Sequence, residues 1–334
     1  MRALICGIKG VALDKEERAF LRETAPWGVI LFLRNIETPA QVARLTAEIR
    51  DVLGREAPIL VDQEGGRVQR LAPPHWRAYP AAARFEAAGA DAAQAQRLAW
   101  LGASLIAHDL RQVGFNVDCL PVLDTPSEDS HGVIGHRAYS RDPARVAAIG
   151  RAAAEGLMAG GVVPVMKHIP GHGRARADSH LELPVVEASR EELERVDFAP
   201  FKTNADLPMA MSAHVVYTAI DAAAPGTLSK TVISEIIRGH IGFDGLLITD
   251  DLSMKALTGS FRERAERAIG AGCDVVLHCN GDLAEARPVA EGAPILAGKA
   301  LERAEAALEC VQRIEPFDVA EATREFDAAM SAVA

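Results

Sequence analysis

The sequence lacks the features of secreted and membrane-spanning proteins. Five cysteines in 334 residues are an odd number without the spacing of a disulfide framework, and most lie in or beside apolar segments, as reduced cytosolic thiols do. No apolar run approaches the roughly 20 residues that a membrane-spanning helix needs. The opening segment MRALICGIKG is too short and too weakly apolar for a signal peptide. We therefore expect a protein that stays in the cytoplasm.

The chain also lacks an excess of positive charge. Its net charge is −10, whereas nucleic acids and anionic membranes are bound through basic patches. We therefore expect neither as a partner, although a local basic pocket for an acidic substrate is compatible with this balance. No linker, charge block or internal repeat divides the sequence, which predicts a single catalytic domain over residues 1–334. We expect it to be a monomer.

Short apolar runs rich in β-branched residues recur along the chain, with helical patterns between them. Each run is nearly continuously apolar, which is typical of parallel strands covered on both faces. The predicted strands are Ala3–Gly7, Gly28–Phe32, Pro58–Val61, Asn116–Leu123, Val163–Met166, Pro208–Ala213, Gly245–Thr249 and Cys273–His278.

The intervening segments have the spacing of amphipathic helices. Leu45, Ile49 and Val52 fall on one face of the segment that Pro39 begins and Gly54 ends, and both of these residues stand in favoured places. Further helices are predicted at Ala92–Gln112, Pro143–Ala159, Ser189–Phe201, Leu301–Ile314 and Val319–Met330. Eight strands alternating with helices predict a single (β/α)8 barrel of the TIM type, on which helices from about residue 283 pack. A doubly wound open sheet is the alternative.

Polar side chains follow six of the predicted strands. In a (β/α)8 barrel these positions meet at the mouth that carries active sites, and six in succession argue against a capping role for each. Asp250 follows a rigid apolar run and suits a nucleophile on the anomeric carbon of a sugar, whereas Asp251 suits a helix cap. The strand-end residues are Asp62, Asp124, Lys167, His168, His214, Asp250, Asp251, His278 and Asn280.

A histidine-rich segment, Lys167–His180, has three interpretations. His168, His172 and His180 would ligate a metal together with Asp250, but their spacing matches no familiar metal set. Alternatively, Asp178 and His180 form a carboxylate–imidazole pair that works as a general acid and base near neutral pH. The segment is otherwise only a polar loop. Spacing alone favours the Asp178–His180 pair over the metal.

The segment Asp62–Leu71 also contains groups suited to sugar binding. The Asp62 carboxylate can accept two hydrogen bonds from vicinal hydroxyls, and Arg70 can contact the same ligand from the side. Arg137 supplies another cation in the long loop after the fourth predicted strand. A solvated turn is the alternative.

Four motifs together resemble the glycoside hydrolase family 3 β-N-acetylhexosaminidases of bacterial cell-wall recycling. They are DQEGGRVQRL at Asp62–Leu71, VIGHRAY at Val133–Tyr139, KHIPGHGRARADSH at Lys167–His180 and ITDDLSM at Ile248–Met254. The segment GVILFLRN at Gly28–Asn35 is also similar to the family, and the match runs in order to about Asn280. Ile169 departs from the family, where an aromatic residue is common.

The resemblance implies a role for each matching residue. Asp250 matches the nucleophile that forms a glycosyl-enzyme intermediate, His180 matches the general acid and base, and Asp178 matches its partner. Asp62, Arg70, Arg137, Lys167 and His168 match the positions that bind the N-acetylglucosamine unit. The implied substrate is an N-acetylglucosaminyl-anhydromuramoyl compound, with or without a peptide, and no metal or organic cofactor is implied.

The β-glucosidase branch of the family has a second, sandwich domain that provides a glutamate acid. We expect no such domain in this protein, which leaves His180 as the expected acid. Three alternatives stay open, namely a phosphorolytic enzyme, a metal-dependent barrel hydrolase and a non-catalytic sugar sensor. The first is considered because an imidazole acid/base repels phosphate less than a carboxylate does. The sensor is disfavoured because Asp250, Asp178 and His180 are all present.

Overall fold

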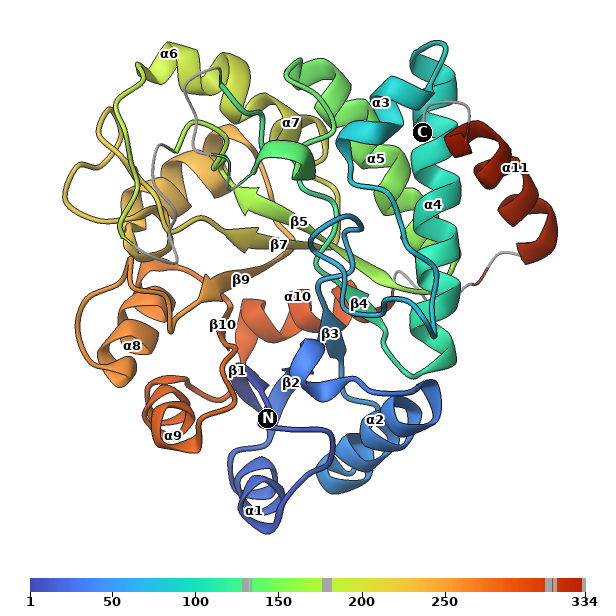
Figure 1. Ribbon diagram of the computed structural model, residues 1–334. Helices are drawn as coiled ribbons and strands as arrows, with labels where there is room; N and C mark the ends of the chain where they lie inside the picture. Colours follow the sequence, from blue (N-terminus) through green and yellow to red (C-terminus); the bar gives the residue numbers. More distant parts are fainter. Residues whose placement is uncertain (128–131, 133, 176–181, 310–313, 315–316, 332–334) are drawn as a thin grey trace.

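The computed structural model describes residues 1–127, 132, 134–175, 182–309, 314 and 317–331, and within them eight parallel strands close into a barrel (Figure 1). The order of strands around the barrel is β1-β10-β9-β7-β5-β4-β3-β2, which is the order along the chain. The strands are β1 (Arg2–Gly7), β2 (Pro26–Ile30), β3 (Ile59–Val61), β4 (Val117–Asp118), β5 (Val163–Ile169), β7 (Met209–Ser212), β9 (Leu246–Asp251) and β10 (Val275–His278). The predicted (β/α)8 barrel is confirmed.

Helices surround the barrel and return the chain from one parallel strand to the next (Figure 1). They are α1 (Lys15–Thr24), α2 (Pro39–Leu53), α3 (Ala83–Ala88), α4 (Ala92–Gln112), α5 (Pro143–Ala159), α6 (Arg190–Glu192), α7 (Ala199–Thr203), α8 (Phe261–Ala271), α9 (Leu283–Gly292), α10 (Gly298–Glu309) and α11 (Val319–Ser331). The predicted bounds of α4 and α5 are confirmed. Helix α2 begins after the Thr38 cap with Pro39 in its first turn, and Gly54 ends it at φ 66°, a conformation that favours glycine.

Two predicted elements are interrupted by proline. Strand β4 pairs only at Val117–Asp118, because Pro121 has no N–H for a continued ladder, and pairing resumes in a single bridge between Val122 and Lys167. The helix predicted at Ser189–Phe201 is α6, a π-helical turn and α7, with Pro200 in the first turn of α7. A two-stranded sheet of β6 (Val185–Val186) and β8 (Val216–Tyr217) was not predicted.

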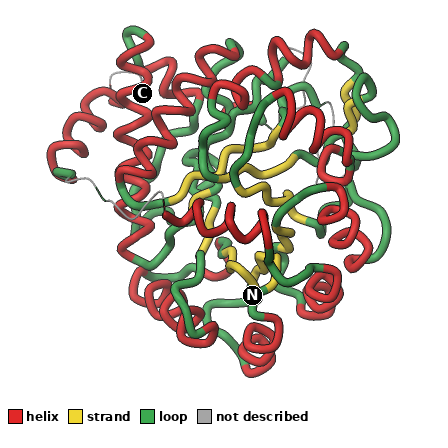
Figure 2. Tube along the Cα trace, turned by 180° about the vertical axis from the view of Figure 1, so that it is seen from behind, coloured by secondary structure: helices red, strands yellow, loops and turns green. Residues whose placement is uncertain are grey.

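The interior of the barrel is a packed core rather than a channel. Inward-facing side chains such as Ile5, Leu60, Val165 and Ile248 are fully buried and form one cluster with residues of α10. Figure 2 shows α10 lying across the barrel when the molecule is viewed from behind. The barrel is therefore filled and covered at one end, and chemistry is confined to the opposite, C-terminal end of the strands.

Three of the five cysteines, Cys6, Cys119 and Cys273, are buried as free thiols, and Cys279 is half-buried and free. Within the described ranges, none of the helices has the length and apolar character that crossing a bilayer would require.

Candidate active site

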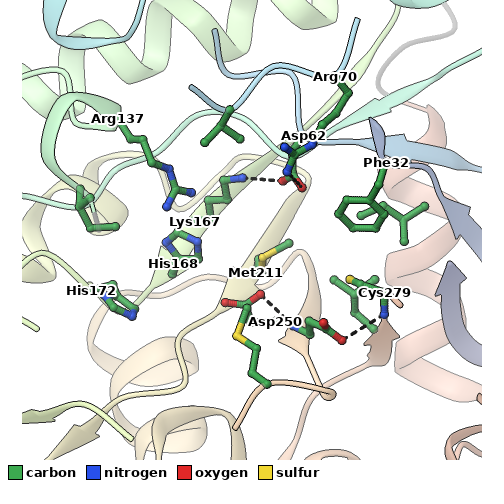
Figure 3. A pocket seen from close by; sticks show the side chains of 16 residues that line it. Phe32, Asp62, Arg70, Arg137, Lys167, His168, His172, Met211, Asp250 and Cys279 are labelled. Carbon is green, nitrogen blue, oxygen red and sulfur yellow. Dashed lines mark hydrogen bonds and ion pairs between the residues drawn. The ribbon is translucent and has the colours of Figure 1, made fainter. Parts of the chain in front are cut away.

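A pocket of about 170 Å³ opens at the C-terminal end of the strands (Figure 3). It is lined by Ile30, Phe32, Asp62, Val68, Arg70, Ile134, Arg137, Lys167, His168, His172, Met211, Asp250, Asp251, Met254, Leu277 and Cys279. Six of the eight site residues predicted from the sequence are among them, namely Asp62, Arg70, Arg137, Lys167, His168 and Asp250. The other two, Asp178 and His180, lie outside the described residues, so their pairing stays a prediction.

A row of alternating charges runs along one side of the pocket in the order Arg70–Asp62–Lys167–Glu64–Arg137, and all of its members except Glu64 line the pocket. We call it the charge row. The Lys167 ammonium lies 2.8 Å from Asp62 Oδ1 and 2.6 Å from Glu64 Oε1. Arg137 donates to both oxygens of Glu64, each at 2.8 Å, and Arg70 lies 3.4 Å from Asp62. Because guanidinium–carboxylate forks have a fixed geometry, the row holds its donors and acceptors in set directions.

The charge row also keeps its members ionised. Burial by itself raises the pKa of the Asp62 carboxyl, but the Lys167 ammonium and the Arg70 guanidinium outweigh it and lower that pKa well below its usual range. Burial likewise opposes ionisation of Glu64, whose pKa is lowered by Lys167 and Arg137. In Lys167, burial alone would lower the pKa, and the two carboxylates raise it instead. Three cations and two carboxylates leave the row with one net positive charge, suited to hydroxyl and carbonyl groups of a polar ligand.

A second polar cluster lies beside the row and is centred on Asp124, which follows β4 and is fully buried. Asp124 Oδ2 lies 2.7 Å from His168 Nδ1, and Oδ1 accepts from the backbone N–H groups of His168 and His172 at 3.2 and 2.7 Å. Burial raises the pKa of Asp124, but the nearby His168 ring and its hydrogen bond lower it to about 2. The ionised carboxylate therefore places the His168 ring proton on Nδ1.

Replacing Asp124 with asparagine tests this cluster. The amide N–H would face His168 Nδ1, so the ring proton should move to Nε2, which ¹⁵N NMR of the imidazole would show. Because the pKa of Asp124 is lower in the folded protein than its ordinary value near 4, the ionised carboxylate stabilises the fold at pH values above about 4. This stabilisation is lost as the pH falls toward about 2. The variant should therefore lose about 2 kcal/mol of unfolding free energy at pH 7, with a shrinking deficit below pH 4.

The matched control is Asp118→Asn. Asp118 is also fully buried, but burial raises the pKa of its carboxyl well above the usual value instead of lowering it, so its ionised form does not stabilise the fold. We expect no comparable loss at pH 7. An Asp124→Asn protein with the wild-type tautomer of His168 and an unchanged pH profile would contradict the assignment.

Asp250 and Asp251 end β9 and point in different directions. Asp250 is buried, lines the pocket, and accepts the Asp251 N–H on Oδ1 at 2.8 Å. Asp251 instead accepts from the backbone N–H groups of Ser253 and Cys279, both at 3.0 Å, and from the Ser253 hydroxyl. The predicted capping role is thus met in part, because Asp251 caps a turn rather than a helix. Of the two carboxylates at the end of β9, Asp251 is therefore the one held by the following turn and by Cys279.

Sequence reasoning missed the roles of several residues. Glu64, quoted only as part of a motif, joins Lys167 to Arg137 in the charge row, and the sequence feature that could have indicated this is its spacing of two residues from Asp62. Asp124 was predicted only as a strand-end residue. Phe32 lines the pocket with the Arg70 guanidinium 5.6 Å from its ring centre. No pattern in the sequence indicates that contact, because the two residues follow different strands.

Some predicted strand-end residues lie outside the pocket. His214 is buried behind β9, with Nδ1 2.8 Å from the Thr227 hydroxyl and Nε2 3.0 Å from the Asp251 carbonyl, and His278 is buried next to Phe261. Considering only the part of the chain that the structure describes, three or more His, Cys, Asp or Glu side chains nowhere gather in a way that would hold a metal ion. His180, one member of the proposed metal set, is outside that part.

Comparison with known proteins agrees with this geometry. The model of the glycosyl hydrolase family 3 N-terminal domain matches residues 5–314. The chain is 42% identical over 277 residues to a β-hexosaminidase of Chromobacterium violaceum, covering 82% of this chain and 77% of the relative. It is 41% identical over 281 residues to a β-hexosaminidase of Pseudomonas aeruginosa, covering 83% and 82%.

A solved structure shares the fold over nearly the whole chain. It is native NagZ from Neisseria gonorrhoeae, with a TM-score of 0.85 and 33% identity, covering 99% of this chain and 96% of that one. The matched family segment contains the charge row, Asp250 and all of the barrel except the first residues of β1. The chain belongs to glycosyl hydrolase family 3, and it is a glycoside hydrolase.

Proposed function

We propose that this chain is a retaining β-N-acetylglucosaminidase that removes terminal, non-reducing β-1,4-linked N-acetylglucosamine from (anhydro)muropeptides in peptidoglycan recycling. The observation that carries the proposal is a buried carboxylate, Asp250, at the tip of β9 in the same pocket as the charge row. The relatives named β-hexosaminidase support the reaction. A structure of the Neisseria protein in complex with N-trifluoroacetyl-D-glucosamine supports the sugar class.

The charge row and His168 bind the non-reducing sugar in this proposal. Carboxylate Asp62 accepts hydrogen bonds from hydroxyls, while Arg70, Lys167 and Arg137 donate to sugar oxygens. Because every one of these groups is already oriented by a neighbour, little ordering is required when the ligand binds. The sugar is thereby held with its anomeric carbon at Asp250.

Two displacements at the anomeric carbon then complete the reaction. In the first, an Asp250 oxygen bonds to that carbon, the bond to the leaving oxygen breaks, and imidazolium His180 gives its proton to that oxygen. In the second, neutral His180 takes a proton from water, the water oxygen bonds to the carbon, and Asp250 departs as a carboxylate. Asp178 orients the His180 ring and favours its charged form. We propose that the chain works as one catalytic domain, as a monomer, in the cytoplasm.

The sharpest test of the nucleophile is covalent trapping. Incubation with a 2-deoxy-2-fluoro or similarly slow glycoside, followed by peptide mass spectrometry, should label the peptide that contains Asp250. Product analysis in phosphate buffer separates hydrolysis from phosphorolysis, because hydrolysis yields the free sugar with retained β configuration and phosphorolysis yields the sugar 1-phosphate. A label on another carboxylate, or inverted product, would overturn the proposal.

Replacing His180 with alanine tests the acid role. The variant should lose about 10²- to 10⁴-fold in rate on substrates with poor leaving groups, which need a proton. The loss should be much smaller on a nitrophenyl glycoside, because nitrophenolate departs without protonation. Rates on a series of aryl glycosides measure this difference. An equal loss across the series would remove His180 from the acid role.

A further inference from the structure

His172 is a pocket-lining residue that the mechanism above does not use. It follows β5, is 3% exposed, and its ring stacks edge-on with the ring of His168 at 5.7 Å between centres. Its backbone N–H is held by Asp124 at 2.7 Å. Figure 3 shows the His172 ring directed toward the open space in front of Asp250, on the side of the pocket away from Arg70.

The two ring nitrogens of His172 have different surroundings. Nδ1 is completely enclosed and has no hydrogen-bond partner within the described residues. Nε2 is not enclosed in this way and forms no hydrogen bond with a described residue. A buried N–H without an acceptor is rarer and costlier than a bare lone pair, so the ring proton belongs on Nε2. His172 therefore presents to the pocket an N–H donor that no described residue accepts.

That donor is uncharged at neutral pH. Burial, together with the nearby His168 ring, lowers the pKa of His172 to about 4. The nitrogen donors of the charge row, in contrast to His172, are cations that are already bound to Asp62 or Glu64. A neutral N–H donor is suited to a neutral acceptor such as an amide carbonyl oxygen.

We infer that His172 is a substrate-binding residue that donates its Nε2–H to the carbonyl oxygen of the acylamino group at C2 of the sugar. The inference rests on the proposed function, because Asp250 must meet the anomeric carbon and C2 is bonded directly to that carbon. A donor on the Asp250 side of the pocket therefore lies near the C2 substituent. The contact would distinguish acylamino sugars from sugars with other C2 groups.

The experiment compares wild type with His172→Leu and His172→Gln on paired nitrophenyl glycosides that carry an N-acetyl or an N-trifluoroacetyl group. Leucine removes the donor at similar volume, whereas a glutamine amide can place N–H near the former Nε2. We expect His172→Leu to lower kcat/KM on the N-acetyl substrate by about 10- to 100-fold, and His172→Gln to recover most of the loss.

Fluorination separates a hydrogen bond from a packing role. Because fluorine weakens the carbonyl as an acceptor, the loss caused by leucine should be at least about threefold smaller on the N-trifluoroacetyl substrate. The electronic effect of fluorine on the reaction itself is the same in both proteins and cancels in the comparison. The matched control is His278→Gln, which alters a buried histidine that does not line the pocket and should retain the wild-type discrimination between the two substrates.

The outcomes separate the two proposals. A wild-type protein that does not hydrolyse the N-acetyl substrate would overturn the proposed function and this inference together. If the wild type does hydrolyse the N-acetyl substrate and the kcat/KM of His172→Leu lies within twofold of the wild-type value, the inference alone would be overturned. The inference would also be overturned if His172→Leu lost the same factor in kcat/KM on both substrates. It would likewise be overturned if His172→Gln, with an unchanged melting temperature, recovered none of that loss. Either result would mean that His172 serves packing.

Discussion

Replacing Asp250 with asparagine should lower kcat by more than about 10⁴-fold while substrate binding stays measurable, because the neutral amide is a far weaker nucleophile toward the anomeric carbon than the carboxylate. Asp250 is buried and fixed by the end of β9, so the shape and polarity of the pocket should change little. Turnover of a nitrophenyl glycoside measures the loss, and calorimetric titration of the inactive variant with substrate measures the retained binding.

The neighbouring carboxylate provides a matched control. Asp251→Asn removes the same charge one residue away, from a carboxylate that also lines the pocket but accepts hydrogen bonds from the backbone N–H groups of Ser253 and Cys279. We expect this variant to lose thermal stability and to remain far more active than Asp250→Asn. Near-normal turnover by Asp250→Asn, or an equal collapse in both variants at equal stability, would remove Asp250 from the nucleophilic role.

Replacing Lys167 with methionine should have the largest effect on stability. The ammonium separates the partly buried Asp62 carboxylate from the buried Glu64 carboxylate, and its loss leaves them facing each other without their shared cation. Breaking a buried ion pair in this way costs about 3–5 kcal/mol at neutral pH. Chemical denaturation should measure that loss, and ligand binding should weaken because the charge row no longer holds its geometry.

The sign of the pH dependence distinguishes this explanation from simple mispacking. In the wild type, the pKa values of Asp62 and Glu64 are lowered, so they stabilise the fold above about pH 4 and this contribution is lost as the pH falls. In Lys167→Met, burial without the cation should raise the same pKa values. Protonation in acid then removes the repulsion between the two carboxylates. The loss of unfolding free energy relative to wild type should therefore shrink between pH 7 and pH 5.

The matched control for this variant is Lys299→Met. Lys299 forms only exposed pairs, at 3.4 Å from Asp244 and 3.7 Å from Glu302, and exposed pairs contribute about 1 kcal/mol or less. The Lys299→Met variant should lose little unfolding free energy, and that small loss should not change between pH 7 and pH 5. A Lys167→Met deficit that stays constant from pH 7 to pH 5 would mean that lost packing, rather than unpaired charge, destabilises the protein.

Local patterns were sufficient to predict the barrel. Buried parallel strands must be apolar on both faces, so the runs that became β5, β7, β9 and β10 stand out in the sequence without any tertiary information. Helices α2, α4 and α5 were equally predictable, because capping residues and proline act over a few residues. Prediction failed where Pro121 and Pro200 interrupted hydrogen-bond ladders that the apolar pattern continues through.

The sequence by itself determined that this is a (β/α)8 barrel with Asp250, Lys167 and His168 at strand ends, because each follows or ends a local apolar run. Only the tertiary structure decided that Glu64 joins Lys167 to Arg137 and that Asp124 orients His168. These pairs are separated by dozens of residues along the chain. Their contacts arise when the barrel closes, and pairing of buried charges depends on distances of a few ångströms that no spacing in a sequence records.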